Sequence, residues 1–183
     1  MKTLKTVLIL ITFLNFTYAF AKDYKIDANK SKVIWTGYAE AGGYAPEGTL
    51  MLSNGSFAMV NNKITSGEFE FDMKTISQEN KDLEKHLKNE DFFDVEKFPK
   101  AFFKITKIST NQVSGILTIK EISKPITFPI EISKVNEMIN VKGTLKIDRT
   151  LYEIKYNSSS YFQDLGSYAI KNQFDIKIDI VAN

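Results

Sequence analysis

The stretch Leu83–Phe103, LEKHLKNEDFFDVEKFPKAFF, decides the fold because the pattern of the chain changes within it. Leu83 and Leu87 lie four residues apart, a spacing that places both on one face of a helix. Pro99 disfavours helix at the residue before it and suits the first position of a new strand. The stretch therefore predicts a helix over about 78–90, a turn, and a strand that opens at Ala101.

On both sides of this stretch, apolar and polar residues alternate as they do in half-buried strands. In the segment 67–73, Phe69, Phe71 and Met73 share one face and three acidic residues share the other. The same alternation predicts strands over 32–37, 101–106, 113–119, 126–132, 139–147 and 174–180. Ser53-Asn54-Gly55, with apolar residues on either side, predicts a hairpin turn between two further short strands.

About eight short strands with one apolar face each, and one inserted helix, indicate an all-β fold. Strands at this regular spacing form an antiparallel barrel or sandwich. The period of the pattern alone does not choose between the two. No long linker or internal repeat divides the chain, so we expect one domain over residues 22–183.

The N-terminus has the features of a secretory signal peptide. Lys2 and Lys5 precede an apolar run from Val7 to Leu14, and Ala19-Phe20-Ala21 provides a small-residue cleavage site. The apolar run is too short to span a bilayer. We therefore predict that residues 1–21 are removed after Ala21 and that the mature protein is periplasmic or secreted.

Charge and cysteine content bear on nucleic-acid binding and on disulfide bonding. Without the two leader lysines, 22 basic side chains face 22 acidic ones, so the mature chain has no net charge. Such a balance gives no general reason to expect nucleic-acid binding. The chain has no cysteine, so an exported protein of this length must be stabilised by its core and not by disulfides.

Four segments in this order resemble the YceI-like, polyisoprenoid-binding family. They are His86–Asp94 followed by Phe98-Pro99, Gly115–Lys120 followed by Lys124-Pro125-Ile126, Asp148-Arg149-Thr150, and Ile154-Lys155-Tyr156. The resemblance runs from about Tyr24 to the C-terminus and implies a lipocalin-like β-barrel that the helix closes over. One departure is clear: the stretch 37–48 lacks the histidine that family members often carry after the first long strand.

The inward face of the predicted barrel is apolar. The pattern alone does not decide whether side chains or a ligand fill the interior. An eight-stranded barrel either fills with side chains or holds one small ligand. Glycines at the inward positions Gly67, Gly115 and Gly143 leave room for a bend or for a ligand. The family resemblance implies a long apolar tunnel for an isoprenoid chain or fatty amide. Its expected wall residues are Trp35, Phe69, Phe71, Phe103, Leu117, Phe128 and Leu145.

His86 and Arg149 are the candidates for polar contact with a ligand. His86 is the only histidine, and it could bind a head group at the mouth, help close the lid, or pack under the helix against a backbone carbonyl. Arg149 is the only arginine, and its planar fork suits either an ion pair across the barrel end or a clamp on a phosphate or carbonyl group.

Metal and enzyme sites have little support in the sequence. One histidine and no cysteine do not make a zinc site without carboxylates and water, and the acidic run Glu90–Glu96 lacks the ligand spacing of a calcium loop. No Gly-x-Ser-x-Gly elbow is present. We predict no catalytic residue, no metal and no cofactor beyond a non-covalently bound lipid.

The sequence thus predicts an exported lipid-binding protein that sequesters or carries a long apolar chain: an isoprenoid, an isoprenoid quinone or a fatty amide. Transient contact with a membrane and pairing of two copies through an exposed strand edge are compatible with this function. The alternative is a filled barrel, for structure or stress response, that acts through its surface.

Overall fold

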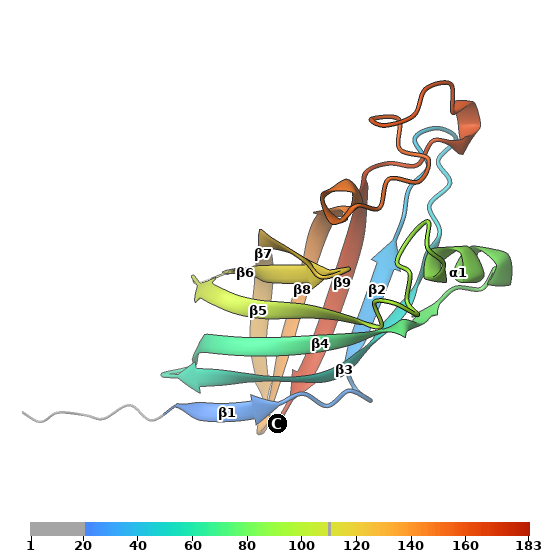
Figure 1. The fold of residues 1–183 in the computed structure, drawn as a ribbon. Coiled ribbons are helices and arrows are strands. Elements are labelled where there is room, and N and C mark those ends of the chain that lie inside the picture. The colour runs from blue at the N-terminus through green and yellow to red at the C-terminus, as the bar shows by residue number, and fades with distance from the viewer. Residues whose placement is uncertain (1–20, 110) are drawn as a thin grey trace, which may run out of the picture.

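The computed structural model describes residues 21–109 and 111–183, so the predicted signal peptide lies almost wholly outside the described residues. Within them the chain forms a closed antiparallel β-barrel with one α-helix (Figure 1). The strands are β1 Lys22–Lys25, β2 Lys32–Thr36, β3 Glu47–Val60, β4 Lys63–Ser77, β5 Lys100–Ile108, β6 Gln112–Ile119, β7 Ile122–Val135, β8 Met138–Asp148 and β9 Gln173–Ala182. The helix α1 spans Lys81–Lys88, and two 3₁₀ turns, η1 and η2, span Arg149–Tyr152 and Gly166–Tyr168.

The strands pair in the order β1-β3-β2-β9-β8-β7-β6-β5-β4, and β4 also pairs with β3. That last pairing closes β2 to β9 into a ring of eight strands, which removes the open sheet edges that an open sandwich would leave. The prediction of an all-β barrel with one inserted helix is confirmed. The short strand β1 was not predicted; it pairs with β3 on one side, and Lys25 and Ile26 at its end pair with Asn183 and Ala182 at the end of β9 on the other.

The predicted hairpin at Ser53-Asn54-Gly55 is wrong. β3 runs without a turn from Glu47 to Val60, and Asn54 and Gly55 pair with Glu70 and Phe69 of β4. The register shifts between Leu52 and Asn54, so the residues that suggested a turn form an irregularity in a long strand. A bulge of this kind bends a strand and increases its twist, which a closed barrel needs.

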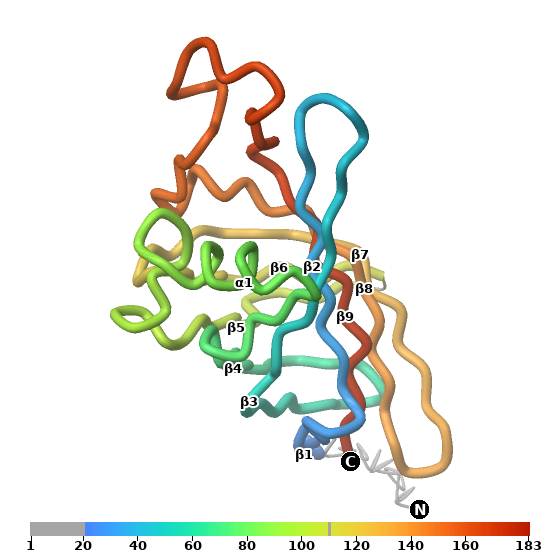
Figure 2. The backbone as a smooth tube through the Cα atoms, turned by 90° about the vertical axis from the view of Figure 1, so that its right-hand side faces the viewer, coloured from blue at the N-terminus to red at the C-terminus, as the bar shows by residue number. Residues whose placement is uncertain are grey.

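The helix lies inside the predicted range but is shorter, from Lys81 to Lys88. The Asn80 side chain caps it by accepting hydrogen bonds from the amides of Asp82 and Leu83, at 3.0 and 3.1 Å. Asn89 adopts an extended conformation and ends the helix. Figure 2 shows that α1 lies across one end of the barrel, the end from which the loops 37–46 and 157–172 project.

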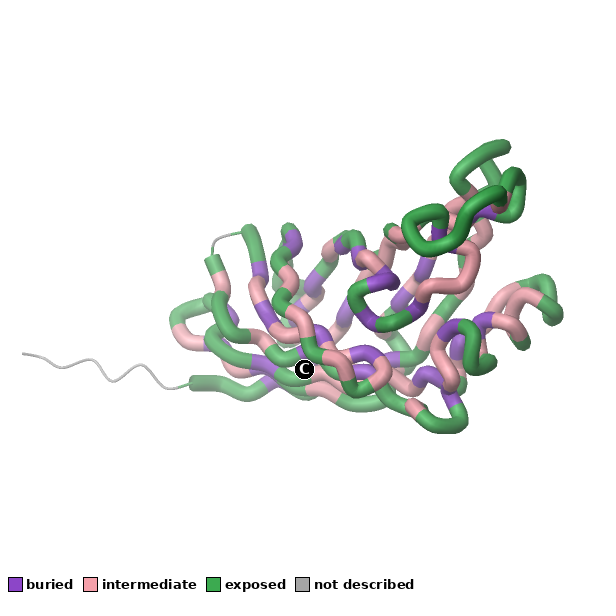
Figure 3. Tube along the Cα trace, turned by 45° about the horizontal axis from the view of Figure 1, so that its top comes forward, coloured by how far each residue is buried: buried purple, intermediate pink, exposed green. Residues whose placement is uncertain are grey.

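Alternation places the outer polar residues in cross-strand ion pairs. Lys100 lies 3.0 Å from Glu70, and Lys142 lies 3.3 Å from Asp179. These exposed pairs contribute little to stability, each on the order of 0–1 kcal/mol. In Figure 3 buried and exposed residues alternate along the strands, while the projecting loops are mostly exposed. The inward residues therefore hold the barrel together and line its interior.

Candidate functional site

The barrel encloses an apolar cavity of about 400 Å³. Every strand of the eight-stranded ring contributes aliphatic or aromatic side chains to its wall. Along β9 alone, alternate residues from Phe174 to Ile180 line it, a distance of roughly 20 Å at about 3.3 Å per residue. The interior is thus elongated and open, and not the solid core that the sequence pattern also allowed.

The seven apolar residues predicted for the wall all border this cavity: Trp35, Phe69, Phe71, Phe103, Leu117, Phe128 and Leu145. Three of them form an aromatic group, because the Phe103 ring lies 6.3 Å from Phe69 and 5.5 Å from Phe128 between ring centres. Phe69 and Phe71 are only partly buried although they point into the barrel. Such residual exposure is expected of side chains that face open space.

The inward glycines do not provide the room for a ligand that the sequence suggested. A Cβ atom added at Gly115 would meet the Phe103 ring and the Lys104 carbonyl oxygen, the latter at 2.5 Å. At Gly143 it would lie 2.9 Å from the carbonyl oxygen of Pro129. Neighbouring strands and aromatic rings already occupy these places, so the glycines serve close packing of the wall.

The helix α1 and the segment that follows it cover part of the end of the cavity where the loops project. Leu83 and Leu87, the pair that predicted the helix, face the cavity together with Phe92 and Phe93. Phe93 also packs edge-on against Phe174 of β9, with ring centres 6.4 Å apart. The helix is amphipathic in the expected sense, with its apolar face directed into the barrel.

Glu84 fixes the polar face of α1. Its carboxylate lies 2.8 Å from the Lys81 ammonium and 2.9 Å from that of Lys88, and it accepts a hydrogen bond from the Gln78 amide at 3.2 Å. These contacts, with the Lys81 hydrogen bond the largest, lower the pKa of Glu84 from its ordinary value of 4.5 to about 2. A carboxylate thus connects the chain before the helix to both of its ends.

The cavity reaches the surface beside two loops, 37–46 and 157–172, and we call this region the mouth. The loops are joined by backbone hydrogen bonds, Glu40 to Ala169 and Lys171 to Tyr38, both of 2.9 Å. Tyr44 and Tyr168 line the cavity and yet expose 60% and 76% of their surface. Both residues therefore stand where the interior opens to solvent.

Arg149 lies at the inner side of the mouth and is buried. Its guanidinium group donates hydrogen bonds to the backbone carbonyls of Ile154, Ile170 and Lys171 at 2.8, 2.9 and 3.1 Å. Among residues 21–109 and 111–183 no carboxylate pairs with it within 4.0 Å, so the predicted ion pair is replaced by carbonyl acceptors. Burial lowers the pKa of Arg149, which nevertheless stays charged because that pKa starts at 12.5.

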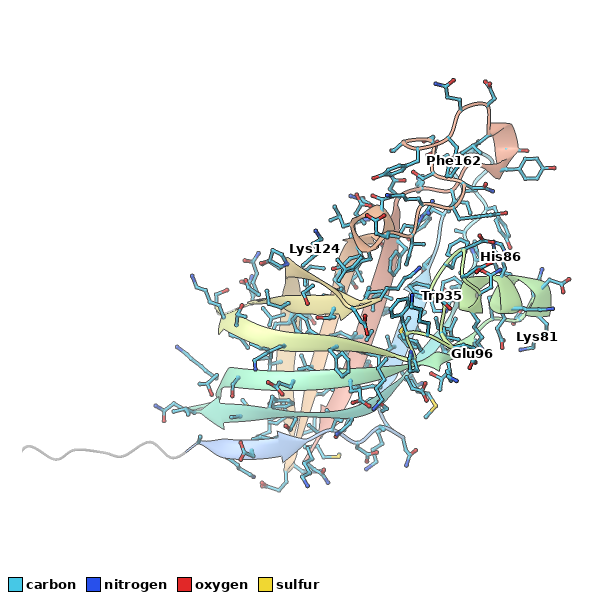
Figure 4. All side chains as sticks on the ribbon, in the orientation of Figure 1. Trp35, Lys81, His86, Glu96, Lys124 and Phe162 are labelled. Carbon is cyan, nitrogen blue, oxygen red and sulfur yellow. The ribbon has the colours of Figure 1, made fainter. Side chains whose placement is uncertain are left out.

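His86 packs in a second layer behind the cavity wall (Figure 4). Its ring contacts Phe92 and Tyr156, with ring centres 5.2 and 4.6 Å apart. Nδ1 lies 3.3 Å from the Asn89 amide nitrogen, and the buried Nε2 has no hydrogen-bond partner within the described residues. The predicted bond to a backbone carbonyl is therefore absent, and His86 is not among the residues that border the cavity.

Polar groups on the wall gather at the mouth. Beside Arg149, the cavity is bordered there by Tyr38, Asn157, Ser167, Lys171 and Gln173. Sequence reasoning missed these five, since four lie in loops and Gln173 is the first residue of β9, where no period assigns a residue to one face. The only feature of the sequence that pointed to this region was the high density of aromatic residues between residues 150 and 170.

Within the part of the chain that the structure describes, no three His, Asp or Glu side chains group as metal ligands. Neither does any helix in that part have the length and apolar character needed to cross a bilayer.

Comparison with known proteins identifies the family. Residues 24–182 match the YceI-like domain, which covers nearly all of the barrel. The chain belongs to the YceI-like family. A UPF0312 protein of Pseudomonas putida strain W619 is 30% identical over 135 residues, which cover 69% of this chain and 70% of that protein. A UPF0312 protein of Staphylococcus aureus strain N315 is 33% identical over 92 residues, 46% of this chain and 54% of its own length.

Solved structures of low sequence identity share the fold. BcnA of Burkholderia cenocepacia superposes with a TM-score of 0.70 at 22% identity, over 86% of this chain and 99% of that one. A polyisoprenoid binding domain from Saccharophagus degradans gives a TM-score of 0.66 at 11% identity, over 87% and 97%. At these identities the comparison supports the barrel architecture and says nothing about individual site residues.

Proposed function

We propose that this protein is exported and binds a long apolar chain molecule inside its barrel, as a carrier or a store. The ligand class is an isoprenoid, an isoprenoid quinone or a fatty amide. The observation that carries the proposal is the elongated cavity, whose wall is apolar along the strands and polar only at the mouth. The polyisoprenoid-binding domain that shares the fold supports the same class of ligand.

The physics of such a site favours a chain over a compact polar molecule. Each methylene removed from water contributes about 0.8 kcal/mol, so a chain of many carbons binds without strong polar contacts. The volume also lies in the range of roughly 300–1,000 Å³ that is usual for ligand sites. A barrel that acts only through its surface needs no such open interior.

The head group would lie at the mouth, where the wall becomes polar. Arg149 donates three hydrogen bonds to carbonyls, so two of its five N–H groups are left to face a ligand oxygen. A quinone or amide carbonyl matches these donors in size and in its acceptor character. Binding, and not catalysis, is the proposed activity: in the described residues the only hydrogen-bond partner of His86 is Asn89, so no hydroxyl is bonded to its ring for activation as a nucleophile.

Native mass spectrometry of the purified protein, with organic extraction of the same sample, tests the proposal. We expect a bound apolar species that is released on extraction, and its mass identifies the ligand class. A chain that is bare as purified and also takes up no added isoprenoid quinone or fatty amide contradicts the proposal. The mass of the chain itself tests export, because cleavage after Ala21 would remove the leader.

A further inference from the structure

We infer that the mouth docks on the surface of a lipid bilayer of neutral charge through an aromatic rim, formed by Tyr44, Tyr161, Phe162 and Tyr168. This inference rests on the proposed function, because it names the source from which the cavity is filled. It is carried by the position of the rim residues, by their exposure, and by the charges around them.

Four of the eight large apolar residues that are exposed in the described part of the chain lie in the two loops of the mouth. The four residues expose 60%, 51%, 50% and 76% of their surface, respectively. The other large apolar residues with comparable exposure are scattered: Met51 on β3, Phe102 on β5, Val135 at the end of β7 and Leu151 in η1. Figure 4 shows Phe162 on the projecting loop, away from the barrel. Aromatic side chains gathered on exposed loops mark an interaction surface.

The rim is continuous with the cavity. Tyr44 and Tyr168 each belong to both, since they border the interior and also face solvent. A ligand that enters or leaves beside these joined loops meets both rings. Because a long apolar chain is stored in bilayers and not in water, the surface that surrounds the opening has to meet a bilayer for direct transfer.

The chemistry of the rim fits the interfacial region of a membrane. Tyrosine combines an apolar ring with a polar hydroxyl, which is why tyrosines are enriched at the level of lipid head groups. Charges in the two loops are few and of both signs: Glu40 and Asp164 are acidic and Lys171 is basic. Beside them, Lys155 bonds Glu153 at 2.5 Å. A surface with so few basic side chains offers little attraction to a strongly anionic partner, so a neutral bilayer is the occupant that it fits best.

The two joined loops hold the rim in place. Ala39 and Ile170 form an isolated β-bridge, and the neighbouring backbone hydrogen bonds tie the loops together on both sides of it. The segments that carry Tyr44 and Tyr168 are therefore fixed to each other, which keeps the entropy of ordering them on docking low.

Sedimentation with vesicles tests the inference on the protein purified from the full chain. Ligand-free vesicles of phosphatidylcholine are compared with vesicles that also contain phosphatidylglycerol. We expect binding to the neutral vesicles, and a loss of about tenfold or more in the triple variant Tyr44→Ser, Phe162→Ser and Tyr168→Ser, because insertion depends on buried apolar area. The matched control, Met51→Ser, Phe102→Ser and Val135→Ser, changes three exposed apolar residues elsewhere and should bind like the wild type.

Three results would overturn the inference: wild-type protein that binds neither vesicle, binding that needs phosphatidylglycerol and disappears with salt, or equal loss in the rim and control variants. If the wild-type protein bound neither vesicle, the rim would instead be a contact surface for a protein partner. Failure of the proposed function can be distinguished from failure of this inference by a measurement without vesicles. Uptake of an isoprenoid quinone delivered from detergent is followed by the fluorescence of Trp35, the only tryptophan. We expect the double variant Tyr161→Ser and Phe162→Ser, at two rim positions that do not border the cavity, to keep this uptake and to lose rapid uptake from vesicles.

A second measurement locates the contact. The chain has no cysteine, so Phe162→Cys and Val135→Cys each provide a single site for an environment-sensitive dye. We expect the emission of the dye at position 162 to shift towards the blue on adding phosphatidylcholine vesicles, while the dye at position 135, at the opposite end of the barrel, does not respond. A shift at position 135 alone, or at neither position, contradicts docking through the rim.

Discussion

Arg149 and Phe92 contact each other across the end of the barrel, with the guanidinium carbon 5.9 Å from the centre of the ring. Arg149 begins the 3₁₀ turn after β8, and Phe92 belongs to the segment after α1. The same guanidinium group bonds three backbone carbonyls of the mouth. A single side chain therefore connects the segment after α1 with the barrel and the mouth.

Replacing Arg149 by methionine should destabilise the fold strongly. The variant Arg149→Met leaves three carbonyl oxygens without their charged donor, and we expect a loss of about 2–4 kcal/mol in the free energy of unfolding. Urea denaturation measures it. The control Lys146→Met removes an exposed cation whose nearest carboxylate oxygen, on Asp175, is 3.4 Å away, and should cost less than about 1 kcal/mol. Similar small losses in both variants would show that the carbonyl bonds contribute little.

Gly48 lies beneath the only tryptophan and should not tolerate a side chain. A Cβ atom there would lie 2.7 Å from Trp35 and would also meet the backbone oxygen of Ser77. We expect Gly48→Ala to cost about 1–3 kcal/mol and to alter Trp35 fluorescence, because the ring has to move. Gly37→Ala is the control, since its Cβ would stand 3.9 Å from the same ring. Unchanged stability in Gly48→Ala would mean that the wall yields without strain.

Much of the barrel was predictable because each strand has one face inside and one outside, which makes the sequence alternate. Alternation placed Phe69, Phe71 and Leu145 on the inward face, and the family resemblance implied that this face lines a tunnel. The turn signal at Asn54-Gly55 failed because pairing with β4 outweighs a local preference, and such pairing is between residues distant in the chain. Strand β1 was missed because only Tyr24 of its four residues is buried.

The mouth could not be predicted to the same degree. Its residues lie in loops, where no period distinguishes inward from outward side chains, and Arg149 was recognised as special only because it is the single arginine. Its partners are backbone carbonyls, which are present in every residue and leave no mark on the sequence. His86 illustrates the same limit, since its contact with Tyr156 joins the helix to a distant loop.

His86 should be replaceable by another aromatic residue. Its ring packs against Phe92 and Tyr156, so we expect His86→Phe to stay within about 1 kcal/mol of the wild-type stability and His86→Ala to lose about 1–3 kcal/mol. Ligand affinity, followed by Trp35 fluorescence, should be unchanged in His86→Phe because the residue does not border the cavity. Reduced affinity in a stable His86→Phe would instead assign the imidazole to the head group.

Acid should loosen the helix through Glu84. Its pKa is about 2 in the folded protein and near 4.5 in the unfolded chain, so its contribution to stability is present above pH 4.5 and is lost as the pH falls towards 2. We expect Glu84→Gln to raise hydrogen exchange of the α1 amides at neutral pH, and the difference from the wild type to vanish towards pH 2. Glu131→Gln, on an exposed residue, is the control. A difference that persists undiminished at pH 2 would contradict the role of the charge.

Filling the cavity should block the ligand without harming the barrel. Ile176 and Ile178 of β9 line the interior and are only partly buried, so phenylalanine at both positions can extend into open space. A ligand that loses two or more methylenes of contact forfeits about 0.8 kcal/mol for each, which lowers its affinity by about tenfold or more. Lys177→Phe adds the same ring to the same strand on its outer face. If the filled and control variants bound the ligand with equal affinity, at unchanged thermal stability, the ligand would not lie against β9.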